Sequence, residues 1–230
     1  MPPAGSNRLL GTRMERLKAS QSYGFVLALI VASFVFAAVA PDKNWAASTL
    51  LLMETATLVV ALWTAGLAAT GSKVSLALIA LASAAAIALV IWGGSSLAGA
   101  VGLLSAAMTF AIGAAIVIGV LDQGEVNRQV VTGAVSIYVL LGFFFIYIYG
   151  AMAAFGHGYL FAQGTDGTRS IRLYFSYVTL ATVGYGDYTM AGNLGRTLAV
   201  LEALMGQLYL VTVLALLVSR MHPKRRLGGE

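Results

Sequence analysis

The chain has 230 residues, of which 59% are hydrophobic and 10% are charged. A water-soluble domain carries roughly 25% charged residues, so this composition predicts an integral membrane protein. Cysteine is absent, which excludes disulfides, thiolate metal sites and a thiol nucleophile. The net charge of +5 does not indicate a nucleic-acid partner, because the cations lie in short loops and tails beside apolar stretches, where they orient a protein in the membrane.

The first 22 residues are polar and basic, and they predict either a short amphipathic helix on the inner leaflet or a disordered tail. The apolar run Tyr23–Ala40 follows and ends in Ala38-Val39-Ala40, which is similar to a signal-peptidase site. Pro41 would follow the cut, however, and at ~1.5 Å per residue the run is long enough to cross a bilayer. We therefore expect a first transmembrane helix here.

Three further apolar runs, Trp45–Ala69, Val74–Trp92 and Ser96–Leu121, meet the ~20-residue requirement for a spanning helix. The third and fourth helices are dense in Ala, Gly and Ser, which predicts close helix packing in lipid. The second helix contains one carboxylate, Glu54. An acid at that depth is costly and often functional, so either Glu54 couples to protons or ions, or it reaches the outer interface or bonds to Thr57.

A charged loop at 122–128 leads to a fifth helix, Gln129–Ala154, which carries the aromatic run Phe143–Tyr149. A Gly-rich loop at 156–167 follows, and then a helix that ends near Ala181. With only about twelve residues this helix is too short to span, so we expect it to be re-entrant. The partial negative charge at its C-terminus would then stabilise a cation.

Either Thr168 or Ser170 is expected to cap the short helix, because a side-chain oxygen at that position accepts from the first free N–H groups. A sixth apolar helix, Thr197–Ser219, ends the hydrophobic part of the chain. The predicted fold is therefore all-α, with six transmembrane helices and a re-entrant helix and loop between the fifth and the sixth.

The segment from Tyr174 to Ala181, followed by Thr182-Val183-Gly184-Tyr185-Gly186-Asp187, resembles the pore helix and selectivity filter of potassium channels. A dehydrated potassium ion needs a stack of oxygen cages, which consecutive backbone carbonyls supply only if they all point the same way. Gly184 and Gly186 can take the positive φ angles that turn alternate carbonyls inward. Val183 and Tyr185 would then point away from the ion and pack against the pore helix.

The resemblance implies that K⁺ binds the backbone carbonyls of Thr182, Val183, Gly184 and Tyr185, with the Thr182 hydroxyl as the innermost ring. The aromatic run of the fifth helix then belongs either to the interface belt or to the packing around the filter. One such loop supplies a quarter of a cage, so a closed ring implies four chains around an axis. K⁺ would be the permeant ion, and no organic cofactor is expected.

The sixth helix resembles the inner helix of bacterial potassium channels, because Gly195-Arg196 begins eight residues after Asp187 and Gly206 lies nineteen after it. Gly206 would be either the gating hinge or a site of close helix packing. By the same register the residues that line the cavity and inner gate are Gln207, Leu210, Leu214, Ala215 and Val218.

Two departures from the family pattern affect gating. Voltage-gated relatives carry repeated Arg or Lys on the fourth helix, but Ser96–Leu121 carries none, so conventional voltage sensing is not expected. Some bacterial channels place a Glu nine residues before the filter Asp, where this chain has Val178. Glu202 is the candidate substitute at the back of the pore helix, or else it makes an intersubunit hydrogen bond. Tyr174 is a second candidate for filter support.

The stretch after Ser219 has eleven residues, in which no nucleotide-binding or calcium-binding domain fits. Its cations predict contact with anionic lipid at the inner leaflet, worth ~1 kcal/mol each, or else they only set orientation. These cations are Arg220, Lys224, Arg225 and Arg226. His222 is either a proton sensor at the inner mouth or a bystander.

Loop charges predict the orientation, with both termini cytoplasmic in a plasma or bacterial inner membrane. The expected inner cations are Arg8, Arg13, Arg16, Lys18, Lys73, Arg128, Arg220, Lys224, Arg225 and Arg226, against Lys43, Arg169, Arg172 and Arg196 outside. The expected divisions are a basic cytoplasmic segment at 1–22, a peripheral four-helix domain at 23–128, a pore domain at 129–220 and a short basic tail at 221–230. The compact chain is typical of a bacterium.

The sequence thus predicts a homotetrameric potassium channel of the bilayer that conducts K⁺ passively. Nothing in it indicates a catalytic triad, a metal site or a nucleotide loop, so we expect no enzymatic activity. Two alternatives remain: a subunit of a potassium uptake transporter, and a non-conducting regulatory membrane protein.

Overall fold

The computed structural model describes residues 22–121 and 127–220. This part of the chain contains seven α-helices. Within these ranges there is no strand, and the extended contacts are isolated bridges from Phe161 to Thr165 and Met190. The all-α prediction is confirmed. The helices are α2 Ser22–Val39, α3 Asn44–Thr64, α4 Ala68–Ile91, α5 Ser95–Leu121, α6 Arg128–Phe155, α7 Arg169–Leu180 and α8 Asn193–Arg220.

Four helices of the described part are long and apolar enough to cross a membrane: α3, α5, α6 and the stretch Asn193–Val213 of α8. Two more apolar stretches, Tyr23–Val39 and Leu76–Ile91, are shorter. The structure therefore agrees with an integral membrane protein, while the expectation of six spans stays a prediction.

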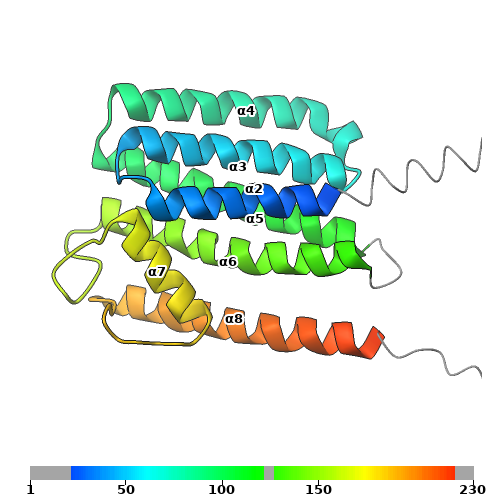
Figure 1. Cartoon of the computed structure of the whole chain (residues 1–230). Helices are drawn as coiled ribbons and strands as arrows, with labels where there is room; N and C mark the ends of the chain where they lie inside the picture. Colours follow the sequence, from blue (N-terminus) through cyan, green and yellow to red (C-terminus); the bar gives the residue numbers. More distant parts are fainter. Residues whose placement is uncertain (1–21, 122–126, 221–230) are drawn as a thin grey trace, which may run out of the picture.

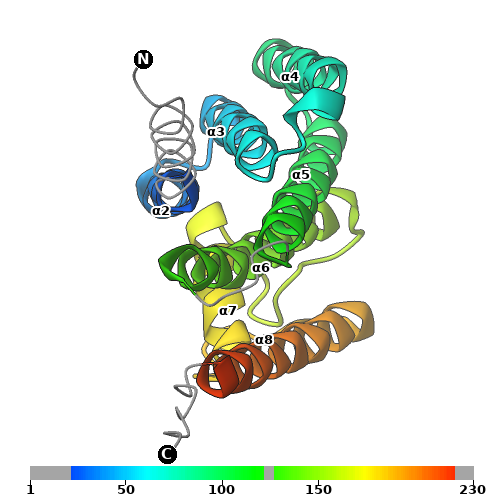
Figure 2. The ribbon, with the colours of Figure 1, turned by 90° about the vertical axis from the view of Figure 1, so that its right-hand side faces the viewer.

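The six long helices lie side by side, and the short helix α7 crosses between α6 and α8 at an angle to both (Figure 1). In the view turned by 90°, α4 and α8 lie at opposite edges of the molecule (Figure 2). Helix α4 packs on α3 and α5, whereas α8 packs on α6 and α7. The helices α2, α3, α5 and α6 between these edges share a buried apolar core that includes Val26, Leu51, Ile112 and Ile116.

The boundary between α3 and α4 differs from the prediction. Helix α3 ends at Thr64 and α4 begins at Ala68, whereas the sequence predicted helices over Trp45–Ala69 and Val74–Trp92. Gly66 has a φ of 72°, a left-handed conformation that ends a helix and is open to glycine. Lys73, expected in an inner loop, consequently belongs to α4.

The start of α7 is fixed by its N-cap. The Thr168 side chain accepts a hydrogen bond from the Ile171 N–H at 3.4 Å, which makes Thr168 the cap rather than Ser170. Such a cap stabilises a helix by about 1 kcal/mol. A second apolar cluster packs α7 against α6 and the adjoining loops. Its buried members are Phe145, Tyr149, Leu160, Phe161, Phe175 and Met190.

Glu54 does not occupy the place expected of an interfacial acid. Its side chain is buried in the helix bundle with 5% exposed, and the Thr57 hydroxyl donates to the Met53 carbonyl instead of to the carboxyl group. The predictions that Glu54 reaches the outer interface or bonds to Thr57 are therefore wrong. Around Glu54 lie residues of α2, α5 and α6, among them Ile30, Ile112 and Phe143, so this face of α3 points into the bundle.

Candidate functional site

The loop that follows α7 has an alternating backbone. Thr182, Gly184 and Gly186 have φ angles of 55°, 59° and 80°, whereas Val183 and Tyr185 between them do not have positive φ. Such alternation turns carbonyls that would point to opposite sides in a strand toward one side. The positive φ angles predicted at Gly184 and Gly186 are thus present.

Thr182 is the residue of this loop whose conformation sequence reasoning missed, because threonine rarely adopts a positive φ. The end of α7 imposes it. The Thr182 N–H donates to the Thr179 carbonyl at 2.9 Å, and the Val183 N–H donates to the Val178 carbonyl at 2.9 Å. These two bonds form the Schellman ending of a helix, in which the residue after the C-cap is left-handed. The short helix therefore sets the first turn of the loop.

The loop is open on this single chain. Val183 is 51% exposed and Tyr185 is 70% exposed, and a Cβ added at Gly184 or Gly186 would meet no atom within 4 Å. Tyr185 nevertheless stacks on Tyr174 of α7, with ring centroids 6.4 Å apart and an interplanar angle of 5°. The pore-helix contact predicted for Tyr185 is present, although most of its side chain remains uncovered.

Tyr174 also links α7 to the end of the loop. A hydrogen bond with the Asp187 side chain raises the pKa of Tyr174 above its ordinary value, because the bond favours the protonated phenol. The same side chain therefore touches the loop at Tyr185 and at Asp187. Tyr174 is in a position to support the loop, as the sequence suggested.

Glu202 of α8 lies directly behind α7 and is completely buried. The Ser176 hydroxyl of α7 contacts Glu202 Oε1 at 2.5 Å, and the Tyr149 hydroxyl of α6 donates to Glu202 Oε2 at 2.6 Å. Ser176 Oγ also lies 3.0 Å from the Gly142 carbonyl oxygen of α6. Glu202 thus approaches the back of α7, through contacts within one chain, and joins three helices.

Sequence reasoning did not find Tyr149 and Ser176 as partners of Glu202. Tyr149 lies in the aromatic run of α6, which suggested an interface belt or packing around the filter. Ser176 is the hydroxyl residue at the middle of α7. A buried acid needs hydrogen-bond donors, and this requirement was the available signal.

Two glycines let neighbouring helices approach α7 closely. A Cβ at Gly206 of α8 would lie 2.2 Å from the Leu180 carbonyl oxygen, and a Cβ at Gly142 of α6 would lie 2.5 Å from the Tyr177 ring. The Tyr177 hydroxyl also donates to the Val139 carbonyl at 2.7 Å. Gly206 is therefore a close-packing position, and its action as a hinge stays a prediction.

The predicted cavity residues lie along α8, most of which is uncovered. Gln207, Leu210 and Ala215 are exposed, and Leu214 and Val218 belong to the same helix. Arg220 is the last residue of α8, whereas His222, Lys224, Arg225 and Arg226 lie outside the described residues. Tyr209 of α8 points toward α6 instead, since its hydroxyl donates to the Ala134 carbonyl of α6.

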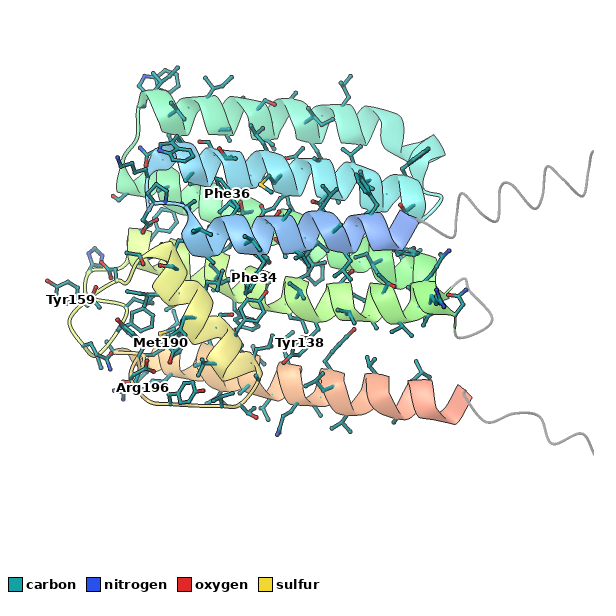
Figure 3. The ribbon with its side chains drawn as sticks, in the orientation of Figure 1. Phe34, Phe36, Tyr138, Tyr159, Met190 and Arg196 are labelled. Atoms are coloured by element: carbon teal, nitrogen blue, oxygen red, sulfur yellow. The ribbon has the colours of Figure 1, made fainter. Side chains whose placement is uncertain are left out.

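The segment after the loop is pinned to the long connection before α7. The Ala162 N–H donates to the Thr189 carbonyl at 2.8 Å, and the Ala191 N–H donates to the Leu160 carbonyl at 3.0 Å. Figure 3 shows Met190 and Arg196 together at the loop end of α8, where Arg196 Nε donates to the Met190 carbonyl at 3.1 Å. Both ends of the loop are thus anchored.

Residues 133–222 match a family model described as Ion channel. This part covers most of α6, all of α7 and all of α8, and it therefore contains the loop and the helices that hold it. No curated protein and no solved structure matches the chain. The match supports an ion channel family and, with the apolar helices, a protein of the membrane.

Proposed function

We propose that this chain is the subunit of a potassium-selective channel that conducts K⁺ passively. One observation carries the proposal: left-handed φ angles recur at Thr182, Gly184 and Gly186, directly after a helix that is too short to span. The carbonyls of Thr182, Val183, Gly184 and Tyr185 would replace the water shell of the permeant K⁺. No organic cofactor is needed for this chemistry.

The pore is shared by four copies of the chain, which gives a homotetramer. A single loop supplies only a quarter of each oxygen cage, and closure around an axis completes it. The exposure of Val183 and Tyr185 in one chain is what such an assembly would cover. The exposed residues of α8, with Leu214 and Val218, would line the cavity below the filter.

The membrane arrangement extends the same proposal. Helices α2 and α4 join the four longer apolar helices as spans, and α7 is a re-entrant half-helix whose C-terminal partial charge stabilises a cation. Residues 129–220 form the pore domain, and residues 23–128 form a peripheral domain. Helix α5 carries no Arg or Lys, so gating does not use an arginine-bearing fourth helix. Both termini face the cytoplasm of a plasma or bacterial inner membrane.

Flux from liposomes tests this function. Purified full-length protein is reconstituted with K⁺ inside and Na⁺ outside, and K⁺ efflux is followed by the proton uptake that it drives. We expect efflux that barium blocks and that stops when Na⁺ replaces K⁺ inside. Equal permeation of sodium, or the absence of barium-sensitive flux, would overturn the proposal, and a saturable flux without single-channel steps would favour an uptake transporter.

A further inference from the structure

A cavity of about 140 Å³ lies between the peripheral helices and the first turn of α7. Helices α3, α4, α5 and α6 supply an apolar wall, with Tyr147 and Ser105 as polar groups. Arg169 and Arg172 of α7 line the cavity from one side, and Asp42 and Lys43 line it from the connection between α2 and α3, next to Asn44 at the start of α3. The cavity therefore joins the peripheral helices to the helix that leads into the loop.

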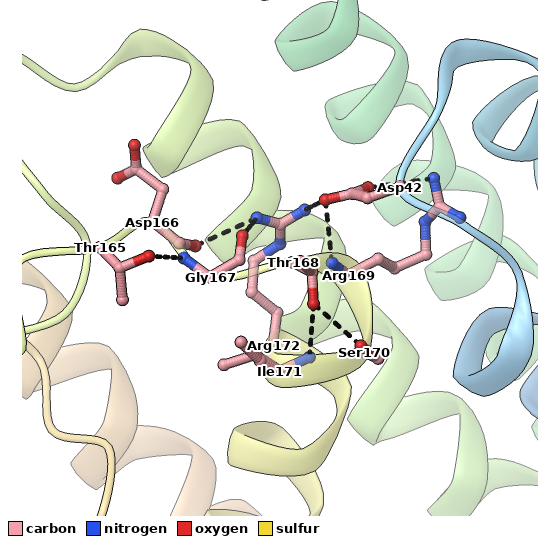
Figure 4. Close-up of polar contacts among 9 residues, drawn as sticks. All are labelled: Asp42, Thr165, Asp166, Gly167, Thr168, Arg169, Ser170, Ile171 and Arg172. Carbon is pink, nitrogen blue, oxygen red and sulfur yellow. Dashed lines mark hydrogen bonds and ion pairs between the residues drawn. The ribbon is translucent and has the colours of Figure 1, made fainter.

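Asp42 holds the two arginines at the edge of this cavity (Figure 4). Asp42 Oδ1 lies 3.5 Å from Arg169 Nη2, and Asp42 Oδ2 lies 3.7 Å from Arg172 Nη2. The backbone N–H of Arg169 donates to Asp42 Oδ2 at 3.1 Å, so the same carboxylate caps α7. Asp42 is thus engaged by both guanidinium groups and by the helix start.

Among the residues that the structure describes, no protein group accepts from some of the donors of these two arginines. Arg169 is 7% exposed, and its Nη1 is buried without a partner. Arg172 gives its Nη1 to the carbonyls of Asp166 and Gly167, but its Nε is buried without a partner. The Tyr147 hydroxyl of the cavity wall makes no hydrogen bond of normal geometry either, although the Glu54 carboxyl group lies beside it. These buried donors need an acceptor, which a ligand or a water molecule can supply.

The charges around the cavity are nearly balanced. Arg169, Arg172 and Lys43 line it with Asp42, and the Asp166 carboxyl group also acts on Arg172. Glu54 lies beside Tyr147 and Ser105. Burial lowers the pKa of Arg172, and the charges of Asp42 and Asp166 oppose this shift while Arg169 adds to it, so the guanidinium group is buried at an energetic cost.

We propose that this cavity binds a small oxyanion, a phosphate or carboxylate group that accepts hydrogen bonds from Arg169 Nη1, Arg172 Nε and the Tyr147 hydroxyl. Hydrogen bonds from arginine to such a group are short and strong, and the planar guanidinium suits its geometry. The ligand would clamp α7 to α3, α5 and α6. It comes either from a free anion or from the phosphate of a lipid headgroup at the same end of the bundle.

Thermal unfolding of the purified full-length protein tests the site without reference to conduction. Sodium phosphate and sodium acetate are titrated at constant pH and ionic strength against sodium chloride, and the unfolding midpoint is recorded. In parallel, the protein in dodecyl maltoside, a detergent without phosphate, is titrated with phosphatidylglycerol and, as the phosphate-free control, with diacylglycerol. We expect a saturable rise of the midpoint in one of the two arms, which identifies the source of the oxyanion.

Variants locate the effect. Arg169→Gln should weaken the apparent affinity by about tenfold or more, because a charged hydrogen bond is lost. Tyr147→Phe keeps the fold and should weaken it less, which protects the test if Arg169→Gln fails to fold. Arg128→Gln removes an exposed cation at the far end of α6 and should leave the affinity unchanged.

Two results would overturn the proposal. The first is a midpoint that no oxyanion and no phospholipid raises above chloride or diacylglycerol, which would mean that water fills the cavity. The second is a rise that is the same in wild type, Arg169→Gln and Tyr147→Phe, which would mean a general salt effect. Because the readout is stability, either result leaves potassium conduction as a separate question.

Discussion

Glu202 and Glu54 are both buried, with 0% and 5% of their surface exposed, but their surroundings differ. Glu202 in the α6–α8 half lies within hydrogen-bond distance of the hydroxyls of Tyr149 and Ser176. Within the described residues, neither oxygen of Glu54 in the α2–α5 half makes a hydrogen bond of normal geometry, although Tyr147 and Ser105 lie beside it. A buried glutamate therefore links three helices by hydrogen bonds in one half, whereas in the other half its carboxyl oxygens lack such bonds.

The two glutamates show that buried hydrogen bonding differs between the two halves of the molecule. A buried polar network that is fully paired favours one arrangement of the helices that it joins, and here it fixes α7. Unpaired buried groups cost free energy, and a protein retains them where a ligand, water or a second state uses them. Tyr23 and Thr109 of the peripheral half are likewise without partners. The pairing around Glu202 therefore fixes α6, α7 and α8 relative to one another, whereas the surroundings of Glu54 add no such constraint.

The largest expected effect comes from Gly206→Ala. The new Cβ would lie 2.2 Å from the Leu180 carbonyl oxygen. The backbones of α7 and α8 would therefore have to move apart, which displaces α7. We expect loss of the folded protein or of its K⁺ flux, measured by size-exclusion chromatography and liposome efflux. Gly113→Ala on α5 is the matched control, since its Cβ meets nothing within 4 Å. Normal flux in Gly206→Ala would show that α8 does not hold α7.

The next largest effect is expected when each of the two buried glutamates is replaced by leucine, because the two variants should differ in stability. Glu202→Leu leaves the buried Tyr149 hydroxyl without an acceptor, which costs about 1–3 kcal/mol of unfolding free energy. Glu54→Leu replaces an unpaired polar group among Ile30, Ile112 and other apolar side chains, so stability should be unchanged or higher. Chemical or thermal unfolding in detergent measures both. Equal losses would remove the distinction between the two halves.

A smaller effect on stability, but a specific one on function, is expected for Gly186→Ala. Its φ of 80° is strained for alanine by about 1–2 kcal/mol, although no atom lies within 4 Å of the new Cβ. Gly94→Ala bears the same kind of strain, at a φ of 93° and with equal space, in the connection before α5. Selectivity for K⁺ over Na⁺ should fall in the first variant alone. The same selectivity in both variants would contradict the proposed filter.

The smallest effect is expected for Tyr174→Phe, which removes the bond to Asp187 and keeps the ring stacked on Tyr185. Because the bond raises the Tyr174 pKa, the protonated phenol and its contribution persist below the ordinary tyrosine pKa and are lost as the pH rises above the shifted value. Single-channel open times should shorten modestly. The wild type should show no tyrosine-dependent change between about pH 7 and about pH 9, and such a change would argue against the bond.

Local patterns in the sequence predicted the features that depend on neighbouring residues. Glycine spacing predicted the positive φ of Gly184 and Gly186, and the Thr168 cap follows from its position before α7. The left-handed Thr182 escaped prediction because a helix ending imposes it against the preference of threonine. Likewise α3 ends before Gly66, earlier than the predicted end at Ala69.

Contacts between distant segments were harder to predict. Glu202 was expected at the back of α7, but Tyr149 lies 53 residues from it in the chain, and no periodic pattern relates the two. Asp42 and Arg169 are 127 residues apart, so their pairing depends on how α2 and α7 pack. Such contacts depend on the angles at which helices pack, and the periodicity of a single sequence does not predict these angles.

The reversal potential of single channels in a planar bilayer tests the central claim most directly. Purified wild-type protein is recorded with K⁺ on one side and Na⁺ on the other. The account predicts unitary currents that reverse far toward the potassium equilibrium potential, with barium block. Unitary currents that reverse near zero, with sodium carrying current as well as potassium, would contradict it.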